Sequence, residues 1–97
     1  SKAMASVGVL TLELHLVDAQ SLKDKRHWVA GLKERLRNRH NVAVAEIDFQ
    51  DVWKRGLVSV VTVSNSRAHC QQMLEAAERT ASQFLGSLLV DTTFEYF

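Results

Sequence analysis

The distribution of hydrophobic and polar residues along the chain predicts four strands. Residues 7–16 alternate with period two and place four leucines on one side, Leu10, Leu12, Leu14 and Leu16. Such alternation is typical of a strand with one buried face. Residues 41–49 alternate in the same way, and residues 57–64 and 88–97 are rich in β-branched or aromatic side chains, as strands are.

Two further segments have the spacing of amphipathic helices. Residues 22–39 repeat apolar side chains along one side, and Ser21 is a suitable N-cap. The second helix follows Asn65 or Ser66, either of which can cap it, and Gly86 is well placed to end it. Its expected buried stripe comprises Cys70, Met73, Leu74, Ala77, Ala81, Phe84 and Leu85.

The element order β-α-β-β-α-β predicts an α+β, ferredoxin-like fold. Two βαβ units with right-handed crossovers give a four-stranded antiparallel sheet in the order 4-1-3-2. Both helices are expected on one face of the sheet, which leaves the other face open. We expect residues 6–97 to form one domain. Residues 1–5, which include three residues before the first Met, are expected to be a vector remnant or a disordered N-terminus.

Composition and charge narrow the class of protein. The net charge is only +1, but residues 21–40 hold seven Lys and Arg against two acidic residues, whereas residues 68–97 have a balance of −3. No apolar run approaches the roughly 18 residues of a membrane-spanning helix, and no secretory signal is evident. The single cysteine, Cys70, cannot form an internal disulfide, so we expect a cytoplasmic protein.

Several phrases of the sequence resemble a known bacterial family. They are "GVLTLELHL", "SLKDKR", "RNRHNVAVAE", "DVWKR" and "VSNS". Together they resemble the YlxP-like family, a small domain of unknown function, over nearly the whole chain from Val7. The resemblance implies a ferredoxin-like domain without an established activity. Through the genomic neighbourhood of the family, it also implies an association with RNA or ribosome biology. It transfers no catalytic residue.

The first predicted helix carries the clearest candidate binding surface. At 100° per residue, four cationic side chains fall within about 80° of one another, beside the apolar side of the helix. We call these four residues the basic stripe: Lys23, Arg26, Lys33 and Arg37. Such a stripe can contact successive phosphates of a nucleic acid. The alternative is an ordinary solvated helix whose long basic side chains cover an apolar edge.

The connection at residues 50–56 is longer than a tight hairpin requires, and it contains an aromatic residue. Trp53 can fold back onto the core. Alternatively, Trp53, Lys54 and Arg55 form an exposed aromatic and basic tip that extends the nucleic-acid-binding surface. The sequence does not decide between these two interpretations.

The open sheet face is a second candidate surface. The residues expected there are Val7, Val9 and Thr11 on the first strand, and Val42 and Val44 on the second. RNA-recognition motifs share this topology but stack bases on aromatic residues of the central strands, which this sequence lacks. An uncovered face with several valines instead favours self-association, so we expect a homodimer.

The sequence offers little for catalysis or metal binding. Glu13 and His15 share a face, as do Glu46 and Asp48, but the predicted strand order separates the two pairs. Cys70 lies on an apolar stripe, where it is expected to be a small core residue. No phosphate-binding loop or nucleophile motif is present. We therefore expect no enzyme activity, no metal and no cofactor.

These observations favour a non-enzymatic binding module, RNA- or ribosome-associated through its basic helix. Two alternatives remain open. The first is a protein-interaction or assembly module that acts through the open sheet face. The second is a small-ligand sensor, a use to which other ferredoxin-like domains are put.

Overall fold

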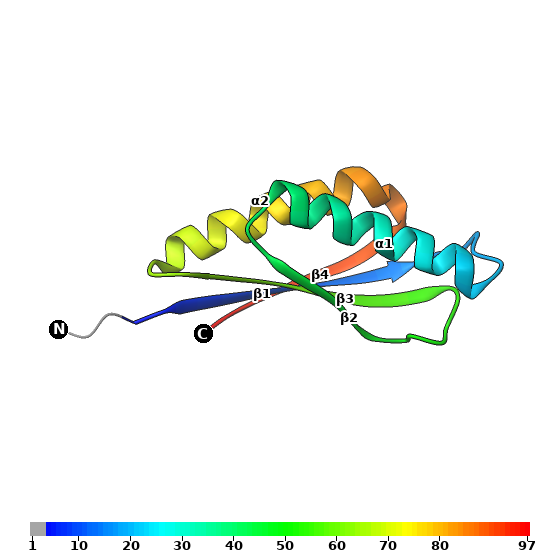
Figure 1. Ribbon diagram of the computed structural model, residues 1–97, viewed down its shortest axis with the longest axis horizontal. Coiled ribbons are helices and arrows are strands. Elements are labelled where there is room, and N and C mark those ends of the chain that lie inside the picture. Colours follow the sequence, from blue (N-terminus) through cyan, green and yellow to red (C-terminus); the bar gives the residue numbers. More distant parts are fainter. Residues whose placement is uncertain (1–3) are drawn as a thin grey trace.

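The structure, a computed structural model, describes residues 4–97 and has the predicted order of elements (Figure 1). The strands and long helices are β1 (Ser6–His15), α1 (Leu22–Arg39), β2 (Ala43–Asp48), β3 (Arg55–Ser64), α2 (Arg67–Leu85) and β4 (Leu89–Tyr96). A short 3-10 helix, Gly86–Leu88, joins α2 to β4. Of the expected N-terminal remnant, residues 1–3 lie outside the described residues, and Met4 and Ala5 precede β1.

The four strands form one antiparallel sheet in the order β2-β3-β1-β4. This is the predicted order, read from the other edge. Both helices lie on one face of the sheet, and within residues 4–97 no helix lies on the other face (Figure 1). α1 contacts the edge strand β2, whereas α2 contacts the two central strands, β1 and β3. The predicted ferredoxin-like fold is therefore confirmed.

Side chains and a glycine define the ends of the two helices. The Ser21 hydroxyl accepts a hydrogen bond from the Asp24 backbone N–H at 3.1 Å, and the Asp24 carboxylate accepts one from the Gln20 N–H at 2.9 Å. Ser66, rather than Asn65, caps α2 by accepting from the His69 N–H. Gly86 ends α2 with φ +56°, a conformation that favours glycine.

The core lies between the sheet and the two helices. The four leucines of the first strand segment are buried, and α1 and α2 add Leu32, Leu36 and Leu74. Gly8 lets α2 approach the sheet closely, because a Cβ at this position would lie 2.7 Å from Leu74 Cδ1. Cys70 is also fully buried and lies within the apolar face of α2.

One part of the predicted sheet is wrong: Val42 and Val44 face the helices rather than the open face. Val44 pairs with Val60, whose side chain is fully buried, and both Val44 and Val42, which directly precedes β2, pack against the core. Alternation separates two faces of a strand but does not state which face is buried. Here the larger valines bury more apolar area beneath α1 than the alanines that alternate with them would. Ala43 and Ala45 consequently occupy the open face.

Candidate nucleic-acid interface

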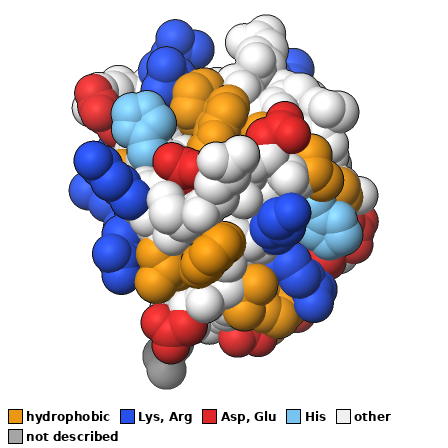
Figure 2. Space-filling model, turned by 90° about the vertical axis from the view of Figure 1, so that its right-hand side faces the viewer, with side chains coloured by type: hydrophobic (Ala, Val, Ile, Leu, Met, Phe, Trp, Pro, Cys, Tyr) orange, Lys and Arg blue, Asp and Glu red, His pale blue; other side chains and the backbone are white. Residues whose placement is uncertain are grey.

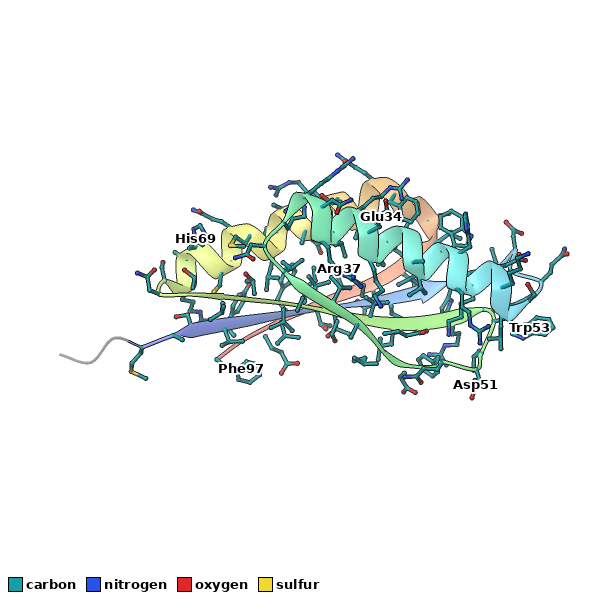
Figure 3. The ribbon with its side chains drawn as sticks, in the orientation of Figure 1. Glu34, Arg37, Asp51, Trp53, His69 and Phe97 are labelled. Carbon is teal, nitrogen blue, oxygen red and sulfur yellow. The ribbon has the colours of Figure 1, made fainter. Side chains whose placement is uncertain are left out.

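The basic stripe lies on the flank of α1 that faces away from α2. The opposite flank contacts Phe84 of α2: the Trp28 and Phe84 ring centroids are 5.3 Å apart, and Arg35 Cζ lies 3.9 Å from the Phe84 centroid. Since α1 covers the β2 side of the sheet, the free flank lies along the edge of the molecule. Figure 3 shows Arg37 on the side of α1 nearest β2, with Glu34 on the outer side.

The four side chains of the stripe remain available for an external partner. Lys23, Arg26 and Arg37 are exposed, and Lys33 is half-buried. Within residues 4–97, the recorded ion pairs involve only Glu13 and Glu46 as acids, and no stripe residue takes part in them. Asp24, an acidic neighbour on the same helix, is occupied by the N-terminal cap.

A buried lysine, which sequence reasoning missed, lies beside this stripe. Lys25 is 1% exposed, and its Nζ lies 2.7 Å from Glu46 Oε2 on β2. Nζ also donates a hydrogen bond to the backbone oxygen of Phe49, directly after β2. Lys25 falls among the apolar residues of α1 when the sequence is drawn on a helical wheel. A lysine on the apolar side of the helix therefore indicates a buried carboxylate partner on the strand beneath it.

The connection between β2 and β3 lies at the N-terminal end of α1. The Leu16 N–H donates to the Lys54 oxygen at 2.8 Å, so this tip runs beside the segment that leads into α1. Trp53 is 48% exposed and is not part of the core, so the fold-back interpretation is wrong. Figure 3 shows Trp53 at the end of the molecule. Trp53 and Lys54 thus lie at the end where the basic stripe begins.

Arg55 is separated from these residues. It lies opposite His15 in the sheet register. Its Nη2 is 3.3 Å from Glu13 Oε2, and its guanidinium lies 4.1 Å from the centroid of the Phe49 ring. Glu13 also lies 3.3 Å from His15 Nε2. Arg55 therefore belongs to a charged cluster on the open-face side, and its charge is already shared with an internal carboxylate.

The open sheet face contains the three predicted residues of β1, namely Val7, Val9 and Thr11. They lie opposite residues of β3, and the Thr11 and Ser59 hydroxyls are 3.2 Å apart. Neither of the two central strands, β1 and β3, contains Phe, Tyr or Trp, and His15 at the end of β1 lies against Glu13. Base stacking of the kind that RNA-recognition motifs use therefore has no platform on these strands.

Two ionisable groups have pKa values that the fold displaces. His40 ends α1, and its Nε2 lies 2.7 Å from Thr80 Oγ1 on α2. Burial, followed by the charges of Arg39 and Arg79, lowers the pKa of His40 below 6.5. Burial also raises the pKa of Tyr96 above 10, with Glu75 contributing. Both shifts favour the uncharged form of the side chain.

Within residues 4–97, no three His, Cys, Asp or Glu side chains are grouped closely enough to hold a metal ion. Neither long helix of this part of the chain has the length and hydrophobicity needed to cross a bilayer.

The fold places this chain in the class of ferredoxin-like α+β domains, and solved structures share its architecture. The de novo designed protein Foldit4 is 10% identical with a TM-score of 0.56, and 97% of each chain is covered. The Bacillus subtilis protein YXEP, a dinuclear metal binding peptidase of the M20 family, is 13% identical with a TM-score of 0.55. That match covers 97% of this chain but 26% of YXEP. At these identities the likeness shows the fold alone.

The sequence identifies the family more closely. Residues 7–94 match the family described as "Protein of unknown function (DUF503)", and the chain belongs to this family. The uncharacterized protein YlxP of Bacillus subtilis is 35% identical over 69 residues, which cover 71% of this chain and 75% of YlxP. The YlxP-like resemblance is therefore confirmed.

Proposed function

We propose that this chain is a non-enzymatic binding module that contacts RNA through the exposed flank of α1. The observation that carries the proposal is the basic stripe itself. Its four cations share one flank of one helix, and none has an ion-pair partner among residues 4–97. Cations without an internal carboxylate partner can bind phosphates without first giving up an ion pair.

The position of the stripe also suits a long, charged ligand. The flank is not covered by α2, and it runs the length of an 18-residue helix, which is about 27 Å at 1.5 Å per residue. Successive phosphates of a nucleic acid can therefore meet successive turns of α1. The near-neutral total charge is compatible with this proposal, since seven of the twelve Lys and Arg residues lie within residues 21–40.

The test is binding of fluorescently labelled ribosomal RNA fragments across a salt series. The native protein is compared with a variant in which Lys23, Arg26, Lys33 and Arg37 are all changed to Glu. We expect native binding to weaken steeply with salt, and we expect the variant to lose it. Equal binding by both proteins, or no binding by either, contradicts the proposal.

A matched pair of variants separates a local surface from bulk charge. Arg26→Glu/Arg37→Glu and Arg67→Glu/Arg79→Glu lower the net charge equally, the first on α1 and the second on α2. We expect the α1 pair to weaken RNA binding strongly and the α2 pair to weaken it little. Equal losses would mean that only the net charge matters.

A second candidate function, assembly of two copies through the open sheet face, has its own support. Val63 is 57% exposed and Ile47 is 50% exposed, and they extend the apolar surface around Val9 and Val61. Apolar association withstands salt, whereas phosphate contacts do not. Analytical ultracentrifugation at 0.05 and 0.5 M salt tests this candidate function. We expect the native protein to be a dimer at both salt concentrations and the Val9→Lys/Val61→Lys variant to be a monomer. A native protein that is monomeric at both salt concentrations refutes it.

A further inference from the structure

The tip at residues 49–54 and the start of α1 form one continuous surface. The backbone contact between Leu16 and Lys54 joins the tip to the end of β1, and Lys25 joins α1 to Phe49. Lys23 projects from the first turn of α1 at the same end of the molecule. Figure 2 looks onto this end and shows Lys and Arg side chains at the left and again to the right of centre, with hydrophobic and acidic side chains exposed between them.

The tip is held in a defined conformation although it is exposed. Phe49 has φ +63°, and its backbone oxygen accepts hydrogen bonds from the Val52 N–H and from Lys25. Lys25 is itself fixed by Glu46 on the adjacent strand. A non-glycine residue in the left-handed region needs such support from its surroundings. Trp53 is therefore presented on a preorganised turn rather than on a loose loop.

Side chains of both charges lie at this end of the molecule, and Asp18 and Asp24 line the same hollow as Lys23 and Arg26. Trp53 projects at the end of the molecule, with the exposed Lys54 next to it in the chain, whereas Asp51 points down, away from α1 (Figure 3). An indole ring that is half-exposed on a fixed turn offers a flat apolar surface for stacking. The nearby lysines supply positive charge, and the basic stripe continues that charge along α1.

We propose that this composite surface binds single-stranded RNA, with one base stacked on Trp53 and the following phosphates along Lys54 and the basic stripe, which begins at Lys23. The proposal rests on the proposed function and names the form of RNA. A stacking platform joined to a track of cations is the arrangement by which proteins hold single strands. The bases of an RNA duplex are stacked internally, so a duplex cannot use Trp53 in this way.

The experiment compares a ten-nucleotide single-stranded RNA of mixed sequence with a duplex of the same length, both fluorescently labelled. The proteins are native, Trp53→Ala, Trp53→Phe and the four-site stripe variant. We expect Trp53→Ala to weaken single-strand binding about tenfold and to change duplex binding less than twofold, and we expect Trp53→Phe to retain most of the affinity. Unchanged thermal unfolding of Trp53→Ala, whose side chain lies outside the core, confirms that the fold is intact.

A direct spectroscopic measurement accompanies the affinities. In a Trp28→Phe background Trp53 is the remaining tryptophan, and we expect single-stranded RNA to quench its fluorescence. If Trp53→Ala binds single strands as tightly as the native protein while the stripe variant does not bind, the stacking proposal fails and the proposed function stands. If no RNA binds the native protein, both fail, and a protein partner for this surface becomes the alternative to pursue.

Discussion

The two long helices are nearly equal in length and both begin at a serine cap, yet they are anchored in different ways. α2 lies on the central strands, and its buried face is uncharged throughout: Cys70, Leu74, Ala77, Thr80, Ala81 and Leu85. α1 lies at the β2 edge, and its buried face contains a lysine: Lys25, Val29, Leu32 and Leu36. α2 is held by apolar packing and by hydrogen bonds, such as that between Thr80 and His40, whereas α1 is also held by a buried ion pair to its edge strand.

The difference follows from position in the sheet. A helix over the central strands buries its lower face deeply, whereas a helix over an edge has one flank without a neighbour. Side chains on that flank can change without disturbing the core, so a binding surface can form there at little expense of stability. The Lys25–Glu46 pair in turn fixes α1 to β2 at the point where the tip begins. The comparison thus points to α2 as the main source of stability, and it leaves the exposed flank of α1 free for the proposed ligand contact.

The largest expected effect is the loss of packing under α2. Leu74→Ala removes a fully buried side chain that fits against Gly8, and we expect the free energy of unfolding to fall by roughly 3 to 4 kcal/mol. Urea denaturation measures the change. Glu75→Ala, at the next position on the exposed side, is the control and should change stability by less than about 0.5 kcal/mol. A loss below 1 kcal/mol for Leu74→Ala would contradict the anchoring role of α2.

The next effect concerns the ion pair under α1. Lys25→Met leaves Glu46 without its cation, and removing one member of a fully buried pair costs about 3 to 5 kcal/mol. The Glu46 side chain retains 20% exposure and can be hydrated, so we expect a smaller loss, roughly 2 kcal/mol, in the free energy of unfolding. Urea denaturation again provides the measurement.

A double variant separates stability from the positioning of the tip. Lys25→Met/Glu46→Leu replaces both charges with apolar groups and should restore stability to within about 1 kcal/mol of native. The double variant still lacks the Lys25 ammonium group, which donates a hydrogen bond to the Phe49 backbone oxygen. In a Trp28→Phe background, we therefore expect lower fluorescence anisotropy of Trp53 in the double variant. Unchanged anisotropy would show that Lys25 does not position the tip.

The sequence predicted the fold because each element carries its own local signal. The leucine alternation of β1, the serine caps and Gly86 are readable one segment at a time, and the bounds of α1 were predicted without error. Which face of β2 is buried depends on its register with β3, which is a contact between distant residues. The assignment of Val42 and Val44 was therefore wrong.

The candidate site shows the same division between local and non-local information. The basic stripe follows from helical spacing alone. The position of the tip beside α1, and the separation of Arg55 from it, depend on how β3 pairs with β1. The position of Lys25 among apolar residues of the helix is enough to predict that it has an acidic partner. That the partner is Glu46 is known only from the contact in the folded structure.

A smaller effect is expected on the salt dependence of the proposed RNA binding, and it differs between an arginine of α1 and one of α2. Arg37 on α1 and Arg79 on α2 are both exposed, and changing either to Gln removes one charge. If Arg37 contacts a phosphate, Arg37→Gln should reduce the slope of log affinity against log salt by about 0.7 for single-stranded RNA. Arg79→Gln should leave that slope unchanged. Equal salt slopes for the two variants would contradict the proposal that α1, rather than α2, contacts the RNA.

The smallest expected effect lies where the two helices meet, at His40 and Thr80. Burial and two neighbouring arginines lower the pKa of His40 in the folded protein, so the unfolded chain binds a proton there at higher pH. The stability associated with neutral His40 is therefore complete above about pH 6.5 and is lost as the pH falls towards the lower folded-state pKa.

We expect the urea midpoint of the native protein to fall slightly more between pH 7.5 and 5.5 than that of His40→Gln, whose amide can still bond to Thr80. His27→Gln, which removes an exposed imidazole from the same helix, is the matched control and should keep the native pH dependence. If His40→Gln also keeps the native pH dependence of the urea midpoint, protonation of the His40 imidazole does not affect stability. The junction of α1 with α2 also contains the packing of Trp28 and Arg35 against Phe84, which involves no imidazole.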